Sequence, residues 1–212
     1  SGGGIYFSGS GSLECVMSKI CAFDCSCIID GQFAHIEIYN YAFCKCHFND
    51  STITHSLKGD INQKDSINLN SVYILFPSNN LTNNECYGCP AFTCATDKSS
   101  TPETCTISYC SVVNNTANGG YCCIRLYRTD TTNRIDTCNI INNKQTSSEY
   151  GIILAYTNIL IKDSCILGND EGKTIFYVYF SANKITISKC TYDNNIYSGS
   201  GSVIFTISVE ST

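Results

Sequence analysis

Cysteine is the residue type in this sequence with the greatest capacity for chemistry. Four cysteines gather around the segment "CYGCPAFTC": Cys86, Cys89, Cys94 and, further on, Cys105. A C-x2-C start followed by more cysteines has the ligand types of a zinc site, but in an exported protein such residues form disulfides. We expect structural disulfides here, because sixteen cysteines in 212 residues is a density that cytosolic proteins rarely carry.

Two further cysteines, Cys122 and Cys123, are adjacent in the chain. Neighbouring side chains on a strand point to opposite faces of a sheet, so one thiol should face the core and the other the outside. The outward thiol could then bond to the cysteine-rich segment and clamp it onto the wall. The sequence alone does not fix the connectivity of any of these cysteines.

The other chemically capable residues form no catalytic pattern. Lyases and hydrolases of polysaccharides need clustered carboxylates, and the candidates here are scattered. These candidates are Asp60, Asp65, Asp163, Asp170 and Glu171. The three histidines, His35, His47 and His55, match no metal-site or triad spacing. The sequence therefore predicts no catalytic residue, no metal and no cofactor.

Composition and sequons indicate the compartment. Asn49, Asn80 and Asn114 each begin an Asn-x-Ser/Thr acceptor for N-glycosylation, which agrees with a secretory route. No apolar run approaches the roughly 20 residues of a membrane helix. A net charge of −5 with only 15% charged residues gives no basic patch, so nucleic acid is not an expected partner. We expect a secreted or cell-surface chain.

A repeat organises the second half of the chain. The copies "CSVVNN", "CNIINN", "CILGND" and "CTYDNN" begin at Cys110, Cys138, Cys165 and Cys190, at intervals of 28, 27 and 25 residues. A short alternating run precedes each cysteine, and a more apolar run follows each polar turn, as in "GIILAY" and "TIFYVYF". Two strands per repeat, without a helical stripe between them, favour a solenoid of parallel β-coils over a propeller, whose blades need about 40 residues.

Stacked coils place equivalent residues in columns about 4.8 Å apart. The first expected column is Cys110, Cys138, Cys165 and Cys190. These cysteines face inward if the residues two positions later face the core. Those later residues are Val112, Ile140, Leu167 and Tyr192. A column of buried thiols and a set of pairwise inter-coil disulfides are both open readings of this pattern.

The second expected column is an asparagine ladder at the turn, formed by Asn114, Asn142, Asn169 and Asn194. Asparagine tolerates the left-handed backbone of a turn, and its amide can bond to the amide on the next coil. An inward Asn114 could not also carry a glycan. The ladder and the sequon therefore compete at this position, and we favour the ladder.

The predicted fold is all-β: one right-handed parallel β-helix over residues 1–212, with coils of about 25–28 residues. The first half repeats less cleanly. Segments 52–71 and 77–104 interrupt the period and are expected to project as loop insertions. Both ends fall inside apparent strands without polar caps, so we expect a piece of a longer repeat chain or copies that stack end to end as a filament.

The segment "VVNNTANGG", Val112 to Gly120, resembles the FxxN and GGA[ILV] motifs of polymorphic outer-membrane protein repeats. Val112 stands for the Phe, Asn115 is the motif Asn and Gly119-Gly120 is the glycine pair; "GGGI" at Gly2 is a second near match. The resemblance implies a right-handed, pectin-lyase-like β-helix on a cell surface, often an adhesin, in a cysteine-rich version of the kind expected on single-celled eukaryotes. The sequence departs from the family in its dense cysteines and its missing Phe.

Together these features predict a non-enzymatic extracellular or cell-surface β-solenoid with a structural or adhesive role. Its expected partners are other copies of itself, or an extracellular or host protein or glycan. The alternatives are a carbohydrate-active enzyme domain of the polysaccharide lyase or hydrolase kind, and a glycan-binding β-helix. The glycan-binding module would use exposed tyrosines such as Tyr177 and Tyr179.

Overall fold

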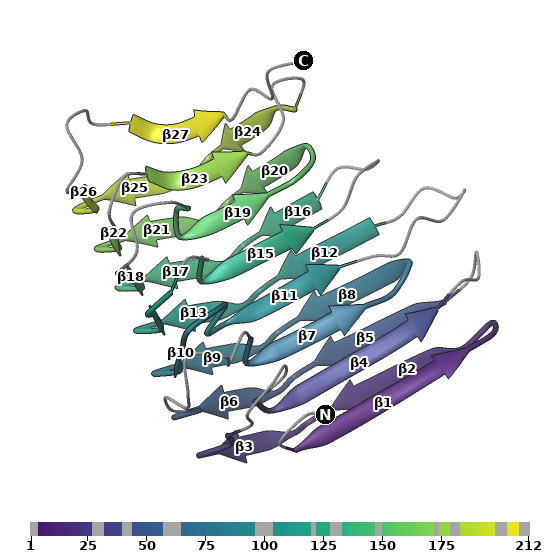
Figure 1. The fold of residues 1–212 in the computed structure, drawn as a ribbon. Helices are drawn as coiled ribbons and strands as arrows, with labels where there is room; N and C mark the ends of the chain where they lie inside the picture. Colours follow the sequence, from purple (N-terminus) through teal and green to yellow (C-terminus); the bar gives the residue numbers. More distant parts are fainter. Residues whose placement is uncertain are drawn as a thin grey trace.

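The computed structural model describes residues 4–26, 32–39, 44–56, 65–95, 104–119, 122–127, 133–146, 150–171, 174–178, 183–197 and 203–207. All the regular structure in these ranges is β-strand, and strands pair in parallel with their equivalents on the neighbouring coils. Figure 1 shows the chain climbing through stacked coils from β1 to β27. The predicted all-β parallel solenoid is therefore confirmed.

The strands form four sheets along the solenoid. Sheet 1 contains β1 (Ile5–Ser10), β4 (Ala34–Tyr39), β7 (Ile67–Asn70), β11 (Phe92–Ala95), β15 (Ile124–Tyr127), β19 (Ile153–Ala155), β23 (Thr174–Val178) and β27 (Val203–Ile207). Sheet 2 contains β2 (Glu14–Ser18), β5 (Lys45–Asn49), β8 (Tyr73–Pro77), β12 (Thr104–Ser108), β16 (Asn133–Asp136), β20 (Ile159–Lys162) and β24 (Ile185–Ser188). Sheet 3 contains β3 (Cys21–Phe23), β6 (Thr52–Thr54), β9 (Asn80–Thr82), β13 (Ser111–Val113), β17 (Asn139–Ile141), β21 (Cys165–Leu167) and β25 (Thr191–Asp193). The short sheet 4 contains β10 (Glu85–Cys86), β14 (Thr116–Ala117), β18 (Lys144–Gln145), β22 (Asp170–Glu171) and β26 (Ile196–Tyr197).

Alternation along each strand builds the core. On β13 and β17, Val112 and Ile140 are register partners and both are buried, whereas Asn139 beside them is exposed. Larger side chains fill the centre of the middle coils. Phe76 stacks with Phe48 at 5.3 Å between ring centroids and lies tilted against Phe92 at 4.7 Å, and all three rings are fully buried.

A first corner joins sheet 2 to sheet 3. It begins on each coil with a residue of left-handed backbone, with φ between 48° and 58°. These residues are Lys19, Asp50, Ser78, Tyr109, Thr137, Asp163 and Lys189. The residues that follow them form a column of mostly small polar side chains: Ile20, Ser51, Asn79, Cys110, Cys138, Ser164 and Cys190.

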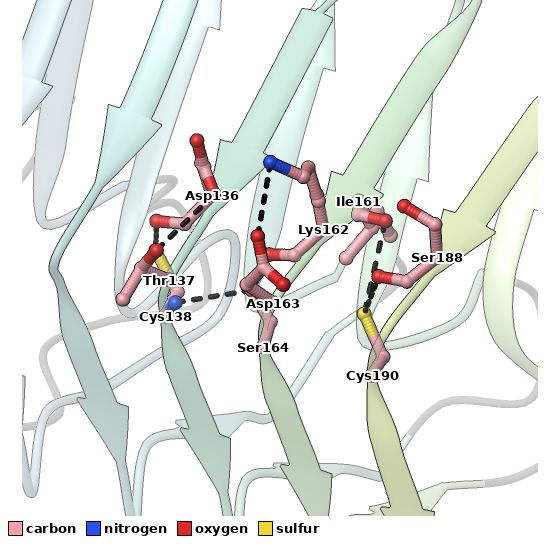
Figure 2. A network of polar contacts seen from close by, with 9 residues as sticks. All are labelled: Asp136, Thr137, Cys138, Ile161, Lys162, Asp163, Ser164, Ser188 and Cys190. Carbon is pink, nitrogen blue, oxygen red and sulfur yellow. Dashed lines mark hydrogen bonds and ion pairs between the residues drawn. The ribbon is translucent and has the colours of Figure 1, made fainter.

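The first-corner side chains bond to the backbone of their own and neighbouring coils (Figure 2). The Ser164 hydroxyl donates to the Lys162 carbonyl at 2.7 Å and accepts the Cys138 backbone N–H at 3.0 Å. The thiols of Cys138 and Cys190 donate in the same way to the carbonyl two residues earlier, at 3.2 Å and 3.3 Å. Cysteine thus takes the place of serine in this column.

A second corner joins sheet 3 to sheet 4, five residues after the first. Its left-handed residues are Asp24, His55, Asn83, Asn114, Asn142, Gly168 and Asn194. The residues that follow are Cys25, Ser56, Asn84, Asn115, Asn143, Asn169 and Asn195. The five asparagines at the end of this column form a continuous ladder, in which the Nδ2 of each of the first four donates to the Oδ1 on the next coil at 2.9–3.1 Å.

This geometry corrects the predicted asparagine ladder. Asn169 belongs to the ladder, but Asn114, Asn142 and Asn194 are the exposed, left-handed residues one position before it. The ladder members there are Asn115, Asn143 and Asn195. The prediction assigned the left-handed turn and the inward amide to one residue. In the structure, the first of two consecutive residues makes the turn and the second points its amide inward.

The predicted cysteine column also needs one correction. Cys165 pairs with Asn139 on the outer face of sheet 3, and Ser164 occupies the column position. The coil between Cys138 and Ser164 is 26 residues long rather than the preceding 28, which moves Cys165 out of phase. Accordingly Ile166, and not Leu167, is fully buried.

The coil period runs through much of the two predicted insertions. Segment 52–71 contains β6 and β7, and segment 77–104 contains β9, β10 and β11, all paired with strands of neighbouring coils. The coil of β7, β8 and β9 lacks the corner cysteine, but Asn79 and Asn84 keep its two corner positions. The remaining parts, 57–64 and 96–103, lie outside the described residues.

Candidate functional site

The outer face of sheet 1 carries the chemically richest set of described side chains. Thr93, Arg125, Leu154 and Tyr177 are register partners on β11, β15, β19 and β23 and form one outward row across the coils. An outward side chain on a bare wall would be exposed, yet Leu154 is fully buried and Thr93 nearly so. This part of the wall is therefore covered by other side chains.

Four tyrosines and an arginine form this cover, and we call them the tyrosine patch: Tyr127, Tyr150, Tyr156, Tyr177 and Arg125. Tyr127 meets Tyr156 edge to face at 4.4 Å between ring centroids, and Tyr150 meets Tyr177 in the same way at 5.3 Å. The Arg125 guanidinium lies 5.1 Å from the Tyr127 ring and 5.8 Å from the Tyr156 ring. Cation–π attraction of this kind fixes a charged group beside aromatic faces.

Below the tyrosine patch lie two thiols. Cys89 and Cys122 are fully buried, and together with Leu154 they form a small apolar cluster against Tyr150, Tyr156 and Tyr177. Their sulfur atoms are 3.9 Å apart. We refer to Cys89 and Cys122 as the thiol pair.

A buried carboxylate adjoins the thiol pair. Asp65 Oδ1 accepts the backbone N–H of Cys89 at 3.1 Å, and the side chain is almost inaccessible to water. Burial raises the pKa of Asp65 above its ordinary value, and it outweighs the Arg125 charge and the hydrogen bond from the Cys89 backbone, which lower it. The outer face of sheet 1 thus combines a buried acid, two thiols and a cation under aromatic rings.

Substituting Asp65 by Asn tests this environment. The pKa of Asp65 is raised in the folded chain, so folding favours its neutral form. The stability that this form contributes is fully present below the pKa of the unfolded chain, and it is lost as the pH rises through the pKa of the folded chain. The amide of Asp65→Asn does not titrate. We expect the variant to gain stability relative to the unmodified chain as pH rises from about 3 to about 7, measured by urea unfolding at each pH. A constant difference would contradict a raised pKa.

The predicted cysteine cluster does not lie in a projecting loop. Cys94 and Cys105 lie on β11 and β12 with buried side chains, and Cys86, also buried, lies on β10. Among the described residues no group of three or more His, Cys, Asp or Glu side chains is arranged to hold a metal ion.

The adjacent cysteines do face opposite sides of the wall. Cys123 belongs to the main core and Cys122 to the outer cluster. Both are fully buried, however, because the tyrosine patch covers the outer thiol. The neighbour of Cys122 is Cys89, which lies in the predicted cysteine-rich segment.

Cys138 offers a test of the first-corner column. Its thiol has the position and the carbonyl contact of Ser164, so Cys138→Ser should retain the stability of the original chain within about 1 kcal/mol. Cys138→Val cannot donate to the Asp136 carbonyl and should lose about 1–2 kcal/mol. Urea unfolding of both variants measures the difference, and a valine variant as stable as the serine variant would contradict the assignment.

The three sequons differ in accessibility. Asn80 and Asn114 are exposed, whereas the half-buried Asn49 amide donates to Ser18 Oγ at 3.3 Å. The predicted conflict at Asn114 disappears, because Asn115 and not Asn114 holds the ladder.

We therefore expect a secretory host to attach glycans at Asn80 and Asn114 and to leave Asn49 largely unmodified. Removal of N-glycans by an endoglycosidase, followed by peptide mass spectrometry, reads the occupancy of each site. A glycan at Asn49 together with none at Asn114 would contradict the prediction that Asn114 is accessible and Asn49 is not.

The remaining candidate residues are dispersed. Lys162 pairs with Asp163 at 3.0 Å and Lys144 with Asp170 at 3.3 Å, both at the surface, so these carboxylates belong to ion pairs (Figure 2 shows the first). His35 lies on sheet 1, His47 on sheet 2 and His55 at the second corner. Asp60 and Tyr179 lie outside the described residues, and of Glu171 only the backbone is described.

Sequence reasoning missed Asp65 and Arg125 as neighbours, and also the non-cysteine members of the first corner. One signal could have found the latter: a constant interval separates the two corner side chains of a coil, as in Ser51 with Ser56 or Cys110 with Asn115. The neighbours on sheet 1 carry no such signal, because segments of variable length precede this sheet.

No protein-family model matches the chain, and neither a curated protein nor a solved structure matches it. Within the described part of the chain, no helix is long and apolar enough to cross a membrane.

Proposed function

We propose that this chain is a non-enzymatic extracellular or cell-surface β-solenoid with a structural or adhesive role, built on a right-handed β-helix similar to polymorphic outer-membrane protein repeats. The observation that carries the proposal is the use of its buried polar side chains. At both corners these side chains bond to the backbone or to the equivalent side chain on the next coil. Such columns stiffen a scaffold and commit their polar groups to structure rather than to catalysis.

The tyrosine patch is the proposed contact surface. Tyr127 is 42% exposed, and the Arg125 guanidinium beside it offers a fixed charge with hydrogen-bond donors. Tyrosine and arginine are the residues most often responsible for binding energy at protein contacts, because they combine large apolar area with polar groups. A flat wall with such a patch is suited to an extracellular protein or to a glycan chain.

Glycan binding is the second candidate, and the tyrosines on the outer face of sheet 1 favour it. Aromatic rings pack against the apolar faces of sugars, and Arg125 can donate to sugar hydroxyls or carboxylates. Hydrolysis in addition would need a pair of carboxylates about 5–10 Å apart at the same surface. Within the described residues, the carboxylate that adjoins the tyrosine patch is Asp65, and it is buried.

A binding and turnover experiment tests the proposal. The full chain, attached to beads, is offered to immobilised extracellular-matrix proteins and to an array of neutral and acidic oligosaccharides, and release of reducing ends is measured with uronate and neutral polysaccharides. We expect retention on at least one protein or glycan surface and no turnover. A double variant, Arg125→Gln with Tyr127→Ala, should weaken that binding about tenfold or more.

Tyr109→Ala is the matched control, because Tyr109 is an equally large aromatic, 68% exposed, at the first corner. It should bind as the original chain does. Steady release of sugar ends would overturn the non-enzymatic role. Equal loss of binding in the control and in the patch variant would remove the tyrosine patch from the contact.

A further inference from the structure

Among the described residues, at least three pairs of cysteines meet across neighbouring coils. Cys15 is the register partner of Cys46 on β2 and β5. Cys110 and Cys138 are neighbours in the first-corner column. Cys89 and Cys122, the thiol pair, lie neither on sheet 2 nor in the first-corner column; they belong to the small cluster on the outer face of sheet 1. The surroundings of each pair decide which one suits a covalent bond.

The corner pair is suited to remain as thiols. Cys110 donates to the carbonyls of Phe76 and Ser108, at 3.0 Å and 3.3 Å, and accepts the backbone N–H of Asn79 at 3.5 Å. Cys138 makes the equivalent contact to Asp136. A disulfide would remove both S–H donors from these contacts. The two cysteines also stand directly opposite each other, because the next residues, Ser111 and Asn139, are register partners.

The pair on β2 and β5 has unfavourable geometry. Cys15 and Cys46 are directly opposite in a parallel ladder, so their Cβ atoms stand about 4.8 Å apart. Disulfides need Cβ atoms about 3.5–4.5 Å apart, with the two Cα–Cβ bonds turned towards each other. Closing this bond would pull the two strands together.

The thiol pair avoids the geometric obstacle, and the carbonyl contact that it would give up is that of the Cys122 thiol with Ile124 at 2.9 Å. Cys89 and Cys122 precede β11 and β15, and the register of Phe92 with Ile124 sets them one residue out of line. The two side chains can therefore approach at an angle rather than in parallel. Their sulfur atoms are already 3.9 Å apart, and both side chains are fully buried.

We propose that Cys89 and Cys122 form an inter-coil disulfide, which closes a 33-residue separation and ties the entries of β11 and β15 together below the tyrosine patch. The oxidant is a small-molecule or protein disulfide, RSSR. One cysteine thiolate attacks RSSR to give a mixed disulfide and RS⁻; the second thiolate displaces the other RS⁻, and the two thiol protons go to solvent or to RS⁻. Two cysteine sulfurs are oxidised, and RSSR is reduced to two thiols.

Burial sets the moment of this reaction. Both sulfurs are inaccessible in the folded chain, and burial raises the pKa of Cys89 well above its ordinary value, which disfavours the attacking thiolate. The bond therefore forms while the coils close and resists reduction afterwards. The inference rests on the proposed export of the chain, but not on any binding by the tyrosine patch.

Oxidative refolding tests the bond directly. The full chain is denatured, reduced and refolded with reduced and oxidised glutathione, and free thiols are then alkylated in denaturant. Digestion without reduction, with fragmentation to separate Cys122 from Cys123, should give one peptide pair that joins Cys89 to Cys122. The oxidised chain should melt about 10 °C above a chain refolded in reductant.

Variants and competing linkages decide the remaining outcomes. The Cys89→Ser variant should lose that difference in melting temperature, whereas the matched Cys110→Ser variant should keep it. Full alkylation of Cys89 and Cys122 in oxidised, folded protein would overturn the proposal. A link from Cys89 to Cys86, or from Cys122 to any other cysteine, would overturn it as well. Peptide mapping of the unmutated chain gives this answer even if a variant fails to fold, and it does so whether or not the tyrosine patch binds a partner.

Discussion

Replacing Asn115 by Ala should lower the free energy of unfolding by about 3 kcal/mol, because several buried groups lose their partners together. Asn115 Oδ1 accepts the backbone N–H of Asn84 at 3.1 Å, and its Nδ2 donates to the Leu81 carbonyl at 2.9 Å and to Asn143 Oδ1 at 3.0 Å. Alanine can supply none of these contacts. Urea unfolding of the unglycosylated chain, followed by circular dichroism, measures the loss.

The adjacent asparagine is the matched control. Asn114 is exposed and has φ of 55°, a conformation that glycine adopts without strain. Asn114→Gly should therefore change stability by less than about 1 kcal/mol. If both substitutions cost the same, the separation of the turn residue from the ladder residue would be wrong.

Replacing Phe76 by Ala should cost about 4 kcal/mol, the typical loss when a fully buried phenylalanine leaves a cavity. Phe76 lies between Phe48 and Phe92 in the core of three successive coils, so neighbouring rings cannot fill the space without breaking register. The same unfolding experiment measures this loss.

Leu75, the preceding residue on β8, provides the comparison. It points outward and is 38% exposed, so Leu75→Ala should cost less than about 1 kcal/mol. A larger loss at Leu75 than at Phe76 would mean that β8 is inserted with the opposite face inward.

Most of the fold could be predicted from the repeat. The interval between cysteines and the alternating runs defined parallel coils, and the inward positions of Val112, Ile140 and Tyr192 were predicted in phase. The prediction was wrong at Cys165, which lies one residue after the column position. The copies were aligned on their cysteines, whereas on this coil Ser164 fills the position. The predicted ladder was wrong by one residue, because a pair of asparagines in the sequence does not show which of the two has the left-handed backbone and which points inward.

The candidate site could be predicted only in part. The vicinal cysteines indicated a contact with the cysteine-rich segment, and Cys122 does meet Cys89. Asp65 and Arg125 join them from other coils, and their association depends on the register of sheet 1. The segments that lead into this sheet vary in length, so spacing in the sequence does not encode that register.

The central claim is that equivalent residues of successive coils stack in register, and a distance measurement tests it most directly. Asn80 and Thr191 are exposed on the outer face of sheet 3 and are linked through Ser111, Asn139 and Cys165 as successive register partners. Spin labels placed at these two positions through a ketone-bearing unnatural amino acid leave the cysteines unmodified. The stacked coils predict a narrow distribution of distances near about 19 Å, four inter-strand spacings, between the two backbone positions. A broad distribution, or one centred far beyond four spacings, would contradict the solenoid and with it every site described on its walls.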